Sequence, residues 1–112
     1  MTHTTQQVKN MTNMKVAMYY QNNDVRIEEQ PIPTISPSEL LIKVKASGIC
    51  GSDVMEWYRI KKAPRVLGHE ITGDIEKVGT NITNFSKGDR VFISHHVPCN
   101  TCRHCLADQH TL

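Results

Sequence analysis

The chain has 112 residues, of which 13 are Lys or Arg and 11 are Asp or Glu, so its formal net charge is +2. This balance argues against nucleic-acid binding, which usually needs a concentrated basic face, and no apolar run approaches the roughly 18 residues of a membrane helix. Residues 1–13 are polar and lack the apolar segment of a secretory signal, so we expect a disordered extension and a cytoplasmic protein. Residues 14–112 have the length of one domain.

Alternating apolar and polar residues predict a series of short strands that are separated by turn signals. The clearest strand covers residues 39–46, with apolar side chains on one face and lysines on the other. In the first strand, Val16, Met18 and Tyr20 are expected to share one face. The first strand is predicted over residues 15–20, and further strands are predicted over residues 25–28, 67–78 and 90–94. This series predicts a mainly β fold, a small and partly open β-barrel with short helices.

Four cysteines occur, and three of them, Cys99, Cys102 and Cys105, follow one another at intervals of three residues. In a chain without an export signal, this spacing favours metal ligation over disulfide bonds. We call these three residues the cysteine loop and expect it to bind zinc, although a closed zinc site needs four ligands. The alternatives are an exposed, oxidisable loop and an iron–sulfur site, which also requires four cysteines.

A second group of zinc-ligand types comes from two separate segments, Gly-Ile-Cys-Gly-Ser-Asp and Gly-His-Glu. In these segments Cys50 supplies a thiolate and His69 an imidazole, and Glu70 is either a third ligand or a nearby carboxylate that exchanges with a substrate oxygen. Zinc with an open position can polarise an alcohol hydroxyl without changing its redox state. Taken alone, a cysteine is usually a small buried hydrophobe, and Gly-His-Glu is usually a turn with a solvated carboxylate.

Two side chains that follow Cys50 are candidates for catalytic roles. The hydroxyl of Ser52 could pass the alcohol proton towards solvent. The carboxylate of Asp53 could accept the free ring N–H of His69, as carboxylates behind metal-bound histidines do. The same stretch predicts a short helix over residues 52–58, with Gly51 or Ser52 at its N-cap.

These motifs, together with Gly-x-x-x-x-Val-Gly and Lys-Gly-Asp-Arg-Val, resemble the medium-chain zinc-dependent alcohol and polyol dehydrogenase family from about Met14 to the last residue. The resemblance implies a GroES-like β-barrel. It also implies catalytic-zinc roles for Cys50, His69 and Glu70 and a proton-relay role for Ser52. The implied partner is a small alcohol or polyol, and a full-length form would use NAD or NADP and form a homo-oligomer.

The chain departs from the family pattern in two places. Met55 stands where some members carry a relay histidine, so proton transfer would pass by water or by another group. The fourth structural-zinc cysteine of the family lies eight residues beyond Cys105, which is past Leu112, so we expect a truncated domain. His104 and His110 are the available substitutes for this ligand, and His110 is better placed by loop length.

No Gly-x-Gly-x-x-Gly turn opens a helix, so these 112 residues lack the motif of a nicotinamide-binding unit. Two hypotheses follow. The chain is the N-terminal zinc-binding portion of an NAD(P)-dependent alcohol or polyol dehydrogenase, inactive alone, or it is a free-standing, non-catalytic zinc-binding barrel or truncated gene product. The truncated chain is expected to expose apolar surface where the coenzyme domain would dock. His95 and His96 are expected on the surface, with a lining of the substrate cleft as the alternative.

Overall fold

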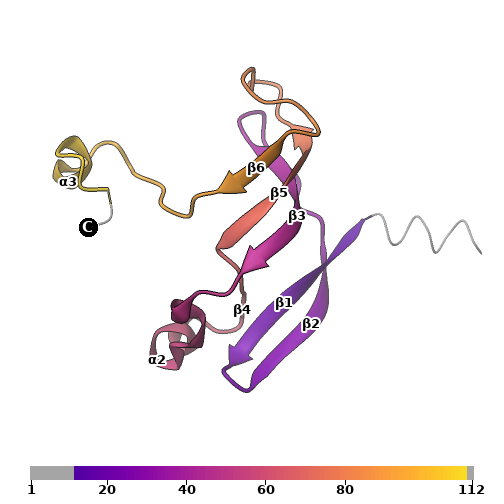
Figure 1. Cartoon of the computed structure of the whole chain (residues 1–112), viewed down its shortest axis with the longest axis vertical. Coiled ribbons are helices and arrows are strands. Elements are labelled where there is room, and N and C mark those ends of the chain that lie inside the picture. The colour runs from indigo at the N-terminus through magenta and orange to yellow at the C-terminus, as the bar shows by residue number, and fades with distance from the viewer. Residues whose placement is uncertain (1–11, 111–112) are drawn as a thin grey trace, which may run out of the picture.

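The computed structural model describes residues 12–110 and contains two three-stranded sheets, with strand orders β2-β1-β4 and β3-β5-β6 (Figure 1). All strand pairs are antiparallel. The predicted mainly β class is confirmed, and the two sheets stay open rather than closing into one barrel. The strands are β1 (Asn13–Gln21), β2 (Asp24–Pro31), β3 (Leu40–Gly48), β4 (Arg65–Val66), β5 (Glu70–Val78) and β6 (Arg90–Ile93), and the helices are η1 (Gly51–Val54), α2 (Glu56–Arg59), η2 (Ile60–Lys62) and α3 (Arg103–Leu106).

The two ends of the described chain differ in how they join the sheets. Residues 1–11 of the extension predicted over residues 1–13 lie outside the described residues, and Asn13 already belongs to β1. At the other end, the chain leaves β6 as an extended arm that carries α3 away from both sheets (Figure 1). Within residues 12–110, no helix has the length and apolar character needed to cross a bilayer.

The hairpin of β1 and β2 contains most of the buried core. Val16 and Met18 are buried, but the most buried side chain of the strand is Tyr19, which is 1% exposed, whereas Tyr20 is only partly buried. The Tyr19 hydroxyl donates to Oδ1 of Asn22 at 2.8 Å, and the Asn22 amide donates in turn to the last carbonyl of η1. Tyr20, which was expected on the same face as Val16 and Met18, lies beside a register shift of β1 and is less buried than they are.

The second sheet is centred on β5, which pairs with β3 on one side and β6 on the other. The strands predicted over residues 39–46 and 90–94 are confirmed as β3 and β6. Ile75 of β5 is 1% exposed and is the buried centre of this sheet. Gly73 lies in β5 beside a register shift of β3, and a side chain at this position would collide with the backbone carbonyl of Lys43. The glycine is therefore required by the close approach of the two strands.

Gly73→Ala is expected to lower the free energy of unfolding by about 1–3 kcal/mol, the usual cost of forcing atoms into a filled space. The added Cβ would overlap the backbone of β3, so the two strands would have to move apart. Urea unfolding followed by circular dichroism measures the change. Gly51→Ala is the matched control, because a Cβ at Gly51 has no atom within 4 Å. Equal stabilities of the two variants would contradict the packing argument.

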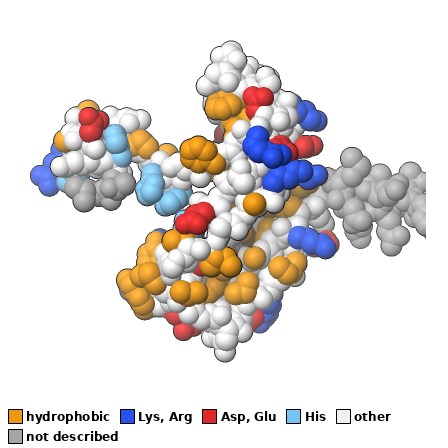
Figure 2. All heavy atoms as spheres, viewed as in Figure 1, with side chains coloured by type: hydrophobic (Ala, Val, Ile, Leu, Met, Phe, Trp, Pro, Cys, Tyr) orange, Lys and Arg blue, Asp and Glu red, His pale blue; other side chains and the backbone are white. Residues whose placement is uncertain are grey.

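Large apolar side chains remain exposed in the described part of the chain, as the sequence predicts. Ile49 is 87% exposed, Phe92 is 81% exposed and Trp57 is 65% exposed. Figure 2 shows apolar side chains gathered over α2 and the neighbouring face of the sheets. An exposed apolar patch of this kind usually marks a contact surface.

Candidate metal centres

The first candidate centre, which we call the open centre, consists of Cys50, His69 and Glu70. Its residues meet where two elements begin. Cys50 immediately precedes η1, and Glu70 is the first residue of β5. The backbone pairing of Gly48 with Glu70 brings the end of β3 beside the start of β5. The predicted strand over 67–78 is interrupted at this point, because Gly68 has a φ of +109°, which suits glycine and turns the chain before β5. The ligand atoms of the three residues all lie within 4.8 Å of one another.

The helix predicted after Cys50 is split in two. Residues 51–54 form the 3₁₀-helix η1, and α2 follows after Met55, whose ψ of 83° breaks the helical path. The N-cap is Cys50 itself, so the prediction of Gly51 or Ser52 is wrong. The physical reason is the Asp53 carboxylate, whose Oδ2 accepts the backbone N–H of Cys50 at 2.8 Å and so starts the helical turn one residue earlier.

The second oxygen of the Asp53 carboxylate faces the imidazole. Its Oδ1 lies 3.5 Å from Nδ1 of His69, and both side chains are largely buried. With Nδ1 turned towards the carboxylate, Nε2 is the ring atom that remains for a metal ion. The geometry that was expected of Asp53 is therefore available in the fold.

Sequence reasoning did not select Arg59, the last residue of α2. Its Nε donates to the carbonyl of Ser52 at 2.9 Å, and its Nη2 donates to the hydroxyl of Ser52 at 2.9 Å and to Oδ1 of Asp53 at 3.0 Å. An arginine followed closely by Lys61 and Lys62 looks like one of several solvated basic residues. The only sequence signal is its spacing of seven residues from Ser52, which is close to two helical turns.

An open hollow of about 390 Å³ lies beside the open centre, and its lining includes His69, Glu70, Phe92 and His95. The ring of His95 stands edge-on to that of His69, with 5.0 Å between their centroids, and His96 stacks on His95 at 4.0 Å. Figure 2 shows histidine side chains gathered near an acidic one where the arm leaves the sheets. His95 and His96 are both exposed, and His95 also forms part of the wall of the hollow.

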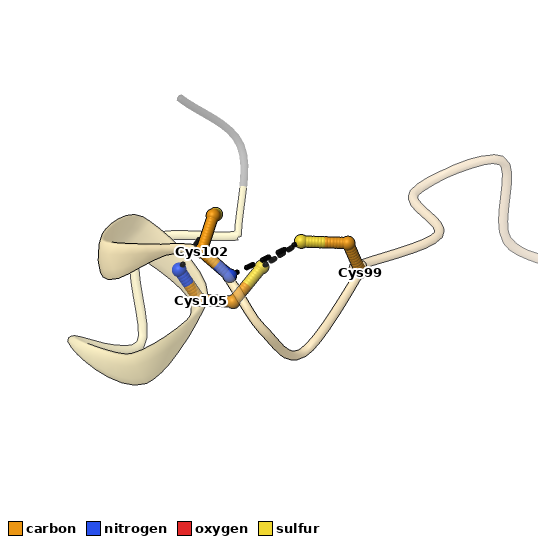
Figure 3. Close-up of side chains that lie close together, drawn as sticks. All are labelled: Cys99, Cys102 and Cys105. Carbon is orange, nitrogen blue, oxygen red and sulfur yellow. Dashed lines mark hydrogen bonds between the residues drawn. The ribbon is translucent and has the colours of Figure 1, made fainter.

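The cysteine loop holds its three sulfurs together at the start of α3 (Figure 3). The Sγ atoms of Cys99 and Cys105 are 3.6 Å apart, and all three sulfurs lie within 4.8 Å of one another. Two thiolates bound to one tetrahedral zinc at 2.3 Å are about 3.8 Å apart. The spacing of these sulfurs therefore fits a single ion.

Backbone N–H groups point at the sulfurs of this loop. The Cys102 N–H donates to Cys99 Sγ at 3.4 Å, and the Cys105 N–H donates to Cys102 Sγ at 3.5 Å. Hydrogen bonds from the backbone and hydroxyl of Thr101, and then from Cys102, lower the pKa of the Cys99 thiol to about 6. At neutral pH this thiol is therefore ready to bind metal as a thiolate.

The two histidines considered as a fourth ligand lie against other side chains. His110 Nε2 is 3.5 Å from Oδ1 of Asp108, and His104 Nδ1 is 3.4 Å from Oε1 of Gln109. Among residues 12–110, the group of ligand atoms within 4.8 Å at this place contains only the three cysteines. A histidine as the fourth ligand therefore stays a hypothesis.

A thiolate, imidazole and carboxylate beside a hollow are the donor set of an open zinc centre, as found in zinc-dependent oxidoreductases. A separate loop of thiolates suits a structural ion. Residues 36–112 match the alcohol dehydrogenase GroES-like domain. The chain belongs to this family, in the group of medium-chain zinc-dependent alcohol and polyol dehydrogenases, as the sequence motifs predict.

Named relatives and solved structures agree with this assignment. The chain is 40% identical to sorbitol dehydrogenase of Bacillus subtilis strain 168, over all of this chain and 32% of that protein. An alcohol dehydrogenase from Escherichia coli CFT073, solved with its cofactor NADH, is 37% identical with a TM-score of 0.78, over 88% of this chain and 29% of that one. A Pyrobaculum aerophilum alcohol dehydrogenase with bound cobalt and zinc is 26% identical with a TM-score of 0.74, over 89% and 32%. The chain thus spans about a third of the length of these relatives.

Proposed function

We propose that the chain is the zinc-binding catalytic portion of an NAD(P)-dependent dehydrogenase for an alcohol or polyol. The convergence of Cys50, His69 and Glu70 beside an open hollow is the observation that carries this proposal. Zinc at this place would lower the pKa of a substrate hydroxyl and prepare the carbon for hydride transfer to the nicotinamide. The proposed full-length form is a homo-oligomer, as the family resemblance implies.

In this proposal the chain's own residues divide the work of binding and orientation. Cys50 and His69 would hold the ion, and Asp53, which faces Nδ1 of His69, would fix the ring so that Nε2 is left for the metal. Glu70 serves as a third ligand or as a carboxylate that exchanges with the substrate oxygen. Its carboxylate lies against Gly48, where a Cβ would be 2.5 Å from Oε2, so the glycine leaves room for this side chain.

Ser52 is proposed to accept the proton that the substrate hydroxyl loses. Its Oγ already accepts one hydrogen bond, from Nη2 of Arg59 at 2.9 Å. A hydroxyl has two lone pairs and one proton, so the second lone pair is free to accept the substrate proton while the hydroxyl hydrogen passes onward. Met55 has no group that takes part in this transfer, so water is the proposed next acceptor.

Ser52→Ala in the full-length enzyme is expected to lower kcat by on the order of 100-fold, the usual effect of removing a positioned proton-transfer group. The Kd for NAD(P) should stay the same, because the proposed relay assigns the serine to the substrate hydroxyl and not to the coenzyme. Steady-state kinetics and coenzyme fluorescence measure the two quantities. Ser47→Ala is the control. Within residues 12–110, the Ser47 hydroxyl forms one hydrogen bond, to the carbonyl of Gly48 at 3.5 Å. An unchanged kcat in Ser52→Ala would remove the serine from the proposed relay.

The proposed function is tested with zinc, NAD⁺ or NADP⁺ and a panel of alcohols, polyols and hydroxy amino acids. Reduction of coenzyme by the full-length form with one of these substrates would support the proposal. The 112-residue chain should bind zinc but leave the coenzyme unreduced, since it has no Gly-x-Gly-x-x-Gly turn. Zinc binding without turnover in any form would favour a non-catalytic zinc-binding barrel.

A further inference from the structure

Arg59 is the one residue that is both charged and buried within residues 12–110. The residue is 7% exposed, although it lies in a helix of only four residues with exposed neighbours. Burying a guanidinium is costly unless its donors are satisfied by partners of suitable geometry. The contacts of this arginine therefore need an explanation beyond packing.

Among residues 12–110, the hydrogen bonds of the Arg59 guanidinium all go to Ser52 and Asp53, which follow Cys50 closely in the chain. Nε and Nη2 form a fork on Ser52, one donor to its carbonyl and one to its hydroxyl, both at 2.9 Å. The same Nη2 reaches Oδ1 of Asp53 at 3.0 Å, and this oxygen also faces Nδ1 of His69 at 3.5 Å. The arginine thus holds both side chains for which the proposed function gives a role next to the metal.

We propose that Arg59 is the positioning residue of the open centre, which holds the Asp53 carboxylate against His69 and aims the hydroxyl of Ser52. This inference rests on the proposed function, because it assigns the arginine a task only if the centre binds a metal. It adds a residue that touches neither metal nor substrate and acts through its two partners.

The geometry requires an arginine rather than any cation. The Asp53 carboxylate has two anchors, the Cys50 N–H on Oδ2 and the guanidinium on Oδ1. A planar guanidinium can serve Oδ1 and both oxygens of Ser52 at once, whereas a lysine ammonium is a point charge without this fork. With lysine in place of Arg59, the carboxylate would keep its charge partner but lose its fixed orientation.

The test measures Co²⁺ binding to the 112-residue chain with all three residues of the cysteine loop changed to serine, so that only the open centre responds. The visible absorption of Co²⁺ reports ligand geometry as well as occupancy. We expect Arg59→Lys to weaken Co²⁺ binding by about 10- to 100-fold, the range found when partners behind metal ligands are changed, and to shift the visible bands. Arg90→Lys is the matched control, because Arg90 forms a similar fork on Asp74, at 2.8 and 3.3 Å, on an exposed surface.

A second pair of variants separates positioning from general stability. If Arg59 acts through the carboxylate, Arg59→Lys should change Co²⁺ affinity little further in a chain that already carries Asp53→Asn. Fully additive losses would overturn the inference. If circular dichroism shows that Arg59→Lys does not fold, the double variant Arg59→Met with Asp53→Asn replaces it, because this variant removes the buried cation and anion together. Its Co²⁺ affinity must then equal that of Asp53→Asn alone.

The outcomes distinguish this inference from the proposed function. A parent chain that binds no Co²⁺ at the open centre would overturn the proposed function, and the role of Arg59 with it. If the parent chain and Arg59→Lys bind Co²⁺ with the same affinity and the same spectrum, the role of Arg59 is overturned and the proposed function stands.

Discussion

Cys50→Ser is expected to weaken zinc binding at the open centre by on the order of 100-fold or more, while the cysteine loop keeps its metal. A serine hydroxyl does not ionise near neutral pH, so the centre would lose its thiolate and retain only His69 and Glu70. The loop should be unaffected, because the two centres share no residue. Competition against a chromophoric zinc chelator measures both the number of bound ions and their affinities.

The control for this experiment is Ser47→Ala, a change close in sequence to Cys50 that leaves both sets of ligands intact. Loss of one zinc equivalent in Cys50→Ser and none in the control is the expected pattern. Simultaneous loss of both ions would contradict the independence of the two centres. Retention of both ions at full affinity would remove Cys50 from the ligands.

Cys99→Ser is expected to release the metal of the cysteine loop with a loss of affinity on the order of 100-fold or more, and to leave the open centre occupied. The change removes the thiol whose pKa is lowered to about 6, so the loop would lose its most readily ionised ligand. Only two sulfurs would remain, too few for a closed zinc site. The intensity of cobalt–thiolate absorption, which scales with the number of bound sulfurs, provides the measurement.

His110→Ala tests what completes this loop. If His110 is a ligand, His110→Ala should bind metal more weakly than the parent chain. Gln109→Ala is the control, and a loss of affinity in His110→Ala alone would identify the imidazole as the ligand. Full zinc affinity in His110→Ala would contradict a role for this side chain. Water or a ligand from outside the described residues would then complete the coordination.

The strands that could be predicted are those whose pattern is local. Residues 39–46 alternate along one strand, and the strand is found there because alternation depends only on neighbours in sequence. The open centre was anticipated from donor types in two motifs, and the backbone pairing of β3 and β5 brings these donors together. Family membership follows from the same motifs.

What could not be predicted depends on particular side-chain hydrogen bonds that residue periodicity does not encode. Tyr19 is more buried than Tyr20, and its hydroxyl is linked through Asn22 to the end of η1, a contact that no alternation within β1 can reveal. The helix start at Cys50 depends on a hydrogen bond from its backbone to Asp53. Arg59 was missed because its hydrogen bonds turn the guanidinium back onto Ser52 and Asp53, whereas its sequence neighbours are exposed.

The two centres also differ in how their ligands are separated along the chain. The cysteine loop closes within residues 99–105 through its own N–H groups, whereas the open centre exists only once β3 and β5 have paired. Closing a short segment costs little chain entropy compared with pairing distant strands. The sulfurs of the cysteine loop can therefore gather without either sheet, whereas the donors of the open centre come together only in the folded protein.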